Sequence, residues 1–179
     1  MTPQERLARL IVAVSLAVWL VPILLLAFAV RVLNLNVPDL WLDEAWSYAI
    51  ARNTPEGIVA YTASNIHEHP PGFCFLLHVW MKLAGDSHFA LRLFSSFGGI
   101  LSVTVLAVLA RRWFNRYVAS LAALLMAIQP MAVQQGRDAR MYAWLMAATL
   151  LTTYALDSAI AGNRWRAWFL FGATALFAI

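Results

Sequence analysis

The sequence predicts an all-α, polytopic transmembrane protein with short juxtamembrane helices in its first outer loop. The composition supports this class, because 62% of the 179 residues are hydrophobic and only 12% are charged, against about 45–50% and about 25% in soluble domains. Long stretches without charge alternate with short basic turns, as in membrane proteins with several spans. The net charge of +4 includes no basic run long enough for nucleic-acid binding, and the single Cys74 excludes an internal disulfide.

The first predicted span covers residues 10–30, a run of 21 residues without a charge between Arg9 and Arg31. About 20 apolar residues cross the hydrocarbon core of a bilayer. A signal peptide has a shorter apolar run, of about 7–15 residues, followed by a small-residue cleavage site. We therefore expect a transmembrane helix here.

Residues 31–88 are expected to form a loop with short helices on the outer surface. Pro38 and Asp39 precede a helical pattern over residues 40–52, and Pro55 marks the first turn of another helix. Residues 71–85 are apolar but too short for a span of about 20 residues, so two placements stay open: a surface or re-entrant helix, or a span.

The later basic turns favour the surface helix. Further spans are predicted at residues 89–110, 117–133 and 143–160, with an incomplete one at 165–179, so that residues 1–179 form the N-terminal part of a larger transmembrane domain. If residues 71–85 do not span, the basic turns at 111–116 and 161–166 lie on the same side as the basic N-terminus. This is the positive-inside arrangement. It predicts a multi-pass protein with a cytoplasmic N-terminus and the acidic loop outside. We expect this protein in the plasma (inner) membrane.

Two adjacent carboxylates, Asp43 and Glu44, stand in an apolar and aromatic run beside the membrane. Charge in such a place is costly and indicates a functional site. The two side chains project about 100° apart on a helix, so one could act on a substrate while the other pairs with an arginine. A desolvated carboxylate could serve as a general base. The alternative is a pair of solvated acids that cap a helix.

A second polar cluster, Arg137, Asp138, Arg140 and Tyr142, lies between two predicted spans. Arg137 and Arg140 share a helix face and could grip a phosphate; interfacial snorkelling is the alternative.

Three further residues are candidates for ligand contacts. His69 could contact phosphate, whereas the pair His67 and His69 is a weak metal signal because no third ligand is evident. Trp46 and Tyr48 could stack on a sugar or anchor the chain at the interface.

Four motifs in order, WLDEAWSY, HPPGFCFLLHVW, FALRLFSSFGG and QGRDARMYAW, resemble the N-terminal part of the GT-C membrane glycosyltransferases. The similarity is to the protein O-mannosyltransferase and aminoarabinose transferase superfamily (glycosyltransferase family 39-like). The resemblance implies an essential acid at Asp43, with Glu44 beside it. It also implies an arginine at Arg92 and an acid at Asp138 before Arg140 and Tyr142. Relatives often carry a lysine where this chain has His69.

The resemblance implies an enzyme that transfers a sugar from a polyprenyl-phosphate-linked donor to an acceptor hydroxyl on the outer face. The implied catalytic residues are Asp43, Glu44 and Asp138. The expected phosphate-binding residues are Arg92, Arg137, Arg140 and His69, although the lysine contact of the relatives does not carry over unchanged to His69. The expected sugar or acceptor contacts are Trp46, Tyr48 and Tyr142.

The expected partners are the lipid-linked sugar, a lipid, glycan or protein acceptor, and membrane lipids. No cofactor is assigned, and a divalent metal stays an open alternative. Residues 1–179 are expected to be inactive alone. The competing function is a non-enzymatic transporter or flippase of a lipid-linked substrate.

Overall fold

The computed structural model describes residues 3–37, 39–64, 71–162 and 165–178, with the backbone alone described for residues 3–17 and 178. Over these residues the chain is all-helical, which confirms the predicted fold class. The helices are α1 (Pro3–Val32), α2 (Leu42–Ala51), α3 (Pro55–Ser64), α4 (Gly72–Ala84), α5 (His88–Trp113), α6 (Arg116–Ile128), α7 (Pro130–Gln135), α8 (Tyr142–Gly162) and α9 (Trp165–Ala178).

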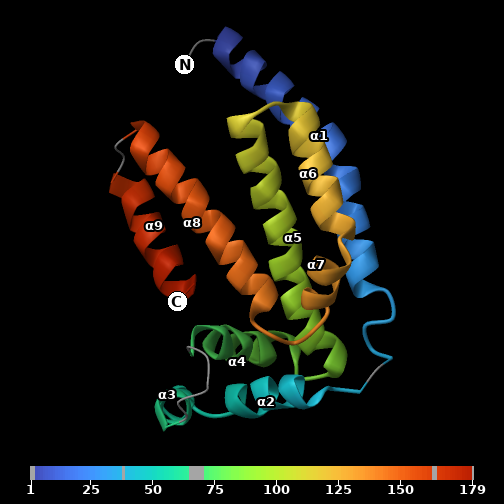
Figure 1. Cartoon of the computed structure of the whole chain (residues 1–179), viewed down its shortest axis with the longest axis vertical. Helices are drawn as coiled ribbons and strands as arrows, with labels where there is room; N and C mark the ends of the chain where they lie inside the picture. Colours follow the sequence, from blue (N-terminus) through green and yellow to red (C-terminus); the bar gives the residue numbers. More distant parts are fainter. Residues whose placement is uncertain (1–2, 38, 65–70, 163–164, 179) are drawn as a thin grey trace.

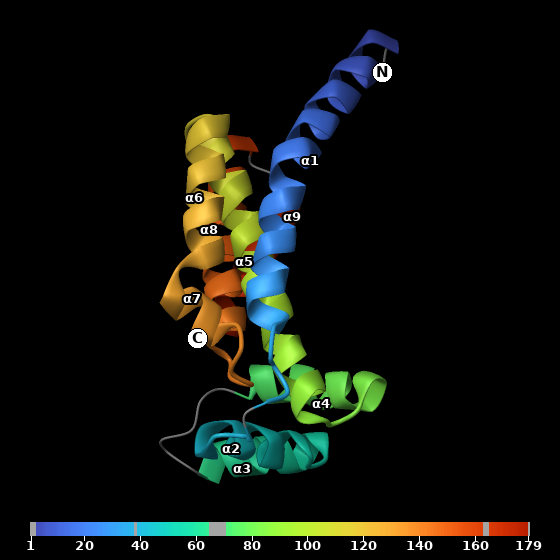
Figure 2. The same ribbon diagram turned by 90° about the vertical axis from the view of Figure 1, so that its right-hand side faces the viewer.

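The long helices form a bundle, and the short helices of the first loop lie across one of its ends. Helices α1, α5, α6, α8 and α9 run along the bundle, whereas α2, α3 and α4 extend across its lower end (Figure 1). The view turned by 90° shows the same separation (Figure 2). Among the described residues, α5 and α8 are long and apolar enough to cross a membrane.

Small residues bring the bundle helices together, as is usual for helices packed within a membrane. Ala27 of α1, Ala107 of α5 and Ala123 of α6 belong to one buried cluster. Helix α5 approaches α8 at Gly98, where an added Cβ would lie 3.1 Å from the backbone carbon of Ala143. A second cluster, centred on Phe94, joins the bundle to α2, α3 and α4.

Local signals set the ends of several helices. The Asn115 side chain caps α6 by accepting hydrogen bonds from the N–H groups of Tyr117 and Val118, at 2.9 and 3.1 Å. Gly85 ends α4 in the left-handed region, with φ of 82°, which favours glycine. Helix α4 has 13 residues, fewer than the about 20 that a span requires.

The predicted span at residues 117–133 is not one continuous helix. The chain leaves the helix at Gln129, which has ψ of 123° and caps α7, while Pro130 begins α7. Proline disfavours helical geometry in the residue before it. The buried Arg31 donates to the carbonyl groups of Met126 and Ala127, at 3.4 and 3.0 Å, and so satisfies carbonyls near the C-terminal end of α6.

Candidate functional site

Glu44 of α2 and Arg92 of α5 form a buried ion pair where the first loop meets the bundle. Their side chains are 2% and 4% exposed, respectively. The Arg92 Nη2 and Nε atoms donate to Glu44 Oε2 and Oε1 at 2.7 and 2.9 Å. Such bidentate pairing fixes orientation as well as position.

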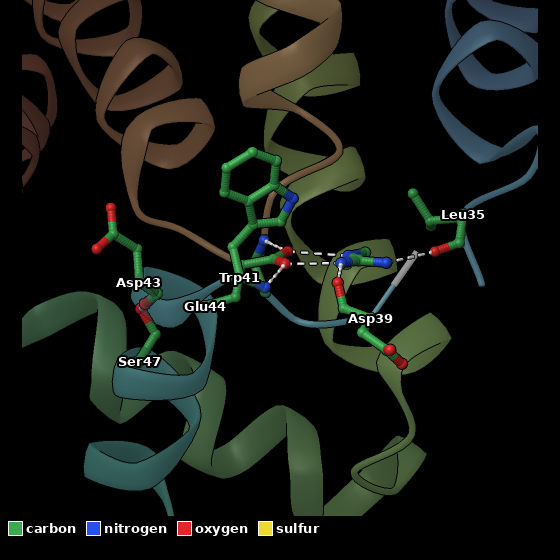
Figure 3. Close-up of polar contacts among 8 residues, drawn as sticks. Leu35, Asp39, Trp41, Asp43, Glu44 and Ser47 are labelled. Atoms are coloured by element: carbon green, nitrogen blue, oxygen red, sulfur yellow. Dashed lines mark hydrogen bonds and ion pairs between the residues drawn. The ribbon is translucent and has the colours of Figure 1, made fainter. Parts of the chain in front are cut away.

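Backbone groups complete the surroundings of this pair. Glu44 Oε1 also accepts the N–H of Ala139, at 2.8 Å, and Oε2 accepts the N–H of Trp41, at 3.0 Å (Figure 3). Arg92 donates further to the carbonyls of Leu35 and Asp39, at 3.0 and 2.8 Å. Glu44 and Arg92 therefore connect α5, the chain before α2, the start of α2 and the segment before α8.

The pKa of Glu44 is lowered. Burial acts to raise the pKa of this carboxyl, but the hydrogen bonds from Arg92 and from the backbone N–H groups of Ala139 and Trp41 outweigh that effect. Glu44 is therefore held as a carboxylate whose oxygens are already engaged within the protein.

Asp43, the neighbouring residue, has the opposite environment. Its side chain is 72% exposed, and it points away from Glu44 (Figure 3). The Arg140 Nη2 atom lies 3.9 Å from Asp43 Oδ2. Arg140 Nη1 also donates to the backbone carbonyl of Asp43, at 3.1 Å. An exposed carboxylate and a guanidinium thus stand side by side.

These side chains border a cleft of about 290 Å³ between the start of α2 and the α7–α8 connection. The lining residues are Trp41, Asp43, Glu44, Gln134, Gln135, Asp138, Arg140 and Tyr142.

Two polar atoms of the cleft-lining side chains are left without a partner. Arg140 Nε and Gln135 Oε1 are buried atoms with no hydrogen-bond partner among the described residues. Arg140 also lies over the Tyr142 ring, with its guanidinium carbon 5.7 Å from the ring centroid. The cleft thus combines three carboxyl groups, a guanidinium, two amides and two aromatic rings, groups that can hydrogen-bond sugar hydroxyls and, at Arg140, a phosphate oxygen.

Asp138 has a raised pKa. Burial is the larger cause and the negative charge of Glu44 adds to it, while Arg92, Arg137 and Arg140 act in the opposite direction. Asp138 therefore differs from Asp43 in being a partly desolvated acid inside the cleft.

The structure brings together part of the predicted site. Asp43, Glu44, Asp138, Arg140 and Tyr142 all line the cleft, whereas Arg92 lies behind Glu44 with its guanidinium buried.

Three further predicted residues are not among the residues lining the cleft, and one is not described. Arg137 is partly buried beside the cleft. Trp46 packs edge-on against Tyr61 with ring centroids 6.5 Å apart. Tyr48 donates to Asp86 at 2.8 Å. His69, with the possible metal pair His67 and His69, lies outside the described residues.

Sequence reasoning missed Gln134, Gln135 and Trp41 as lining residues. The two glutamines stand just before the arginine cluster, at the end of an apolar segment, which is a signal that could have indicated them. The position of Trp41 in the sequence favours an interfacial anchor. No group of three or more potential metal ligands occurs within the described part of the chain.

Comparison with known proteins gives one family match. Residues 68–179 match a family described as dolichyl-phosphate-mannose-protein mannosyltransferase. No curated protein and no solved structure matches the chain. The matched range includes Arg92, Asp138 and Arg140, while Asp43 and Glu44 precede it. The contacts of Glu44 with Arg92 and Ala139 join the acidic loop to the matched range.

Proposed function

We propose a function for this chain from its family, because it belongs to the dolichyl-phosphate-mannose-protein mannosyltransferase family and is a GT-C-like membrane glycosyltransferase. On this proposal the protein transfers a sugar from a polyprenyl-phosphate-linked donor to an acceptor hydroxyl in the cleft beside α2. The family membership favours this function over that of a transporter. On this proposal the helices α2, α3 and α4 face the outer side of the inner membrane, and the basic turns face the cytoplasm.

The observation that carries the proposal is the contrast between the two adjacent carboxylates. Glu44 is buried and its oxygens accept four hydrogen bonds, whereas Asp43 is exposed at the cleft beside Arg140. Asp43, whose carboxylate is open to the cleft, is therefore the base in this proposal. It takes the proton of the acceptor hydroxyl as the oxygen attacks the anomeric carbon of the donor.

Arg140 is the residue best placed to stabilise the leaving group. As the bond between the anomeric carbon and the phosphate oxygen breaks, negative charge grows on the polyprenyl phosphate. The unpartnered Arg140 Nε, together with the adjacent Nη atoms, can donate to a phosphate oxygen. Arg137 and His69 are secondary candidates. Attack opposite the leaving phosphate inverts the anomeric centre.

Glu44 and Arg92 take a positioning role in this mechanism. Their side chains are buried in protein, so neither is free to bind a substrate in this arrangement. Their contacts hold the first turn of α2, and with it Asp43, against the segment that carries Arg140. Asp138 and Tyr142, which line the cleft, are the candidates for contacts with sugar hydroxyls; Trp46 and Tyr48 are weaker candidates because they lie elsewhere on the first loop.

Sugar transfer by the full-length protein tests the proposal. Membranes with the wild type, Asp43→Asn or Asp39→Asn are incubated with radiolabelled polyprenyl-phosphate sugars. We expect Asp43→Asn to lower turnover by about 10²–10⁴-fold, as the loss of a general base does. Asp39 is exposed on the same loop and does not line the cleft, so Asp39→Asn is the matched control. Near-normal turnover by Asp43→Asn would refute the assigned role.

A further inference from the structure

A second cleft lies at the opposite end of the bundle, and nothing in the proposed reaction uses it. It has a volume of about 490 Å³ and lies between α8 and α9, with Arg112 of α5 at its side. This is the end at which α5 turns into α6, far from α2, α3 and α4 (Figure 1). Its lining residues are Arg112, Tyr154, Ala155, Ser158, Ala161, Gly162, Arg166, Ala167 and Leu170.

The two arginines of this cleft differ in their contacts. Arg112 is fixed, because it pairs with Asp157, donates to Ser158 Oγ at 2.9 Å and lies over the Tyr154 ring at 5.8 Å. Arg166 lies over the Trp165 ring at 5.6 Å and makes no hydrogen bond or ion pair with another described residue. Its guanidinium is therefore available to a ligand.

The lining combines positive charge with an apolar wall. None of the described lining residues is acidic, but the Asp157 carboxylate pairs with Arg112, so the uncompensated positive charge is that of Arg166. Ala155, Ala167 and Leu170 extend the cleft along the two helices. Trp165 and Trp168 are 72% and 45% exposed near it. Exposed tryptophans of this kind gather at the level of lipid headgroups.

We propose that this cleft binds an anionic phospholipid, with its phosphate on Arg166 and Arg112 and its acyl chains along α8 and α9. Arginine donors match phosphate oxygens bidentately, and basic pockets between membrane helices take acidic headgroups. Ser158 and Tyr154 supply further polar contacts beside the phosphate. The proposal is independent of the transfer reaction at the other end of the bundle.

Equilibrium binding to the purified full-length protein in a neutral detergent tests this site. The probe is a fluorescent short-chain phosphatidylglycerol, with phosphatidylcholine and inorganic phosphate as competitors. We expect phosphatidylglycerol to bind at least tenfold more tightly than phosphatidylcholine, and millimolar inorganic phosphate to leave it bound.

Three variants locate the binding. Arg166→Gln should weaken binding of phosphatidylglycerol at least about fivefold, the effect of one arginine near an anionic lipid. Arg116→Gln is the matched control, because Arg116 is exposed at the same end, donates to Tyr117 Oη at 2.8 Å and does not line the cleft. Ala161→Leu fills the cleft without changing its charge and should also weaken binding.

Three outcomes would overturn the proposal. Equal losses with Arg166→Gln and Arg116→Gln would indicate diffuse attraction to a basic surface. Equal affinity for phosphatidylcholine would indicate that the headgroup charge is not recognised. Displacement of the lipid by inorganic phosphate at a similar dissociation constant would identify a site for the free anion instead of a lipid.

Discussion

Replacing Glu44 with glutamine should destabilise the protein by about 3–5 kcal/mol, the usual cost of removing one partner from a buried ion pair. Each Glu44 oxygen accepts two N–H groups: Oε1 from Arg92 and Ala139, and Oε2 from Arg92 and Trp41. Glutamine has one such oxygen, so its amide NH₂ must face two of these donors. An unsatisfied buried donor costs about 1–3 kcal/mol, and the Arg92 charge also loses its counter-charge.

Thermal unfolding of the purified protein, followed by circular dichroism, measures this loss. A free-energy change of 1 kcal/mol shifts the melting temperature by about 2–4 °C in a chain of this size, so we expect a decrease of roughly 6–20 °C. Asp43→Asn is the matched control, because the adjacent carboxylate is 72% exposed. Substitutions at such exposed positions usually change stability by less than about 0.5 kcal/mol.

A double variant separates the ion pair from its surroundings. In Glu44→Gln with Arg92→Gln the uncompensated charge is gone, so the combined loss should be smaller than the sum of the single losses by about 1–3 kcal/mol. Strict additivity, or a Glu44→Gln protein that melts with the wild type, would refute the inference that this pair holds the first loop to the bundle.

The structure makes three further predictions. Burial raises the pKa of the Glu44 carboxyl, but the hydrogen bonds to this carboxyl lower the pKa by more. The Glu44 carboxylate therefore stabilises the folded protein fully above the pKa that it has in the unfolded chain. This stabilisation is lost as pH falls through the lower pKa that it has in the folded protein. Melting temperatures at several pH values should show a smaller acid-induced loss in Glu44→Gln than in the wild type. Burial, and then the charge of Glu44, raises the pKa of Asp138, so its ionised form costs stability; Asp138→Asn should melt above the wild type at neutral pH, and the difference should shrink as pH falls and Asp138 takes up its proton. Gly99→Ala should cost about 1–3 kcal/mol, because its Cβ would lie 2.7 Å from Arg31 Nε. Gly172→Ala, with nothing within 4 Å of its Cβ, should be neutral or stabilising by up to about 1 kcal/mol in the same melting assay.

The helical architecture could be predicted from the sequence because apolar runs and turn residues are local signals. The predicted spans at residues 89–110 and 143–160 lie within α5 and α8. The break at Gln129 was missed although Pro130 supplied a local signal for it. The apolar run through residues 117–133 hid that signal, since hydropathy does not register a change in backbone direction.

The candidate site was less predictable because it depends on contacts between distant segments. The sequence indicated that one carboxylate of the pair would meet an arginine, but not which one. That choice depends on how α2 is rotated against α5, and the partner of Glu44 is 48 residues away in the chain. For the same reason the sequence offers no grounds for separating the buried Arg92 from the cleft-lining Arg140.

Two hydrogen bonds, both donated by the segment before α8, relate the proposed base to the proposed phosphate-binding arginine. The N–H of Ala139 donates to the Glu44 side chain at 2.8 Å, and the Arg140 side chain donates to the Asp43 carbonyl at 3.1 Å. Residues 139–140 thus supply both donors and the first turn of α2 supplies both acceptors, over separations of 95 and 97 residues. Because misplacing reacting groups by about 1 Å can cost about 10²-fold in rate, a change that loosens Glu44 should lower turnover without removing any group that touches the substrate. The burial of Glu44 and the exposure of Asp43 are therefore two parts of one arrangement. Glu44 fixes the start of α2, and this sets the position of Asp43, the proposed base.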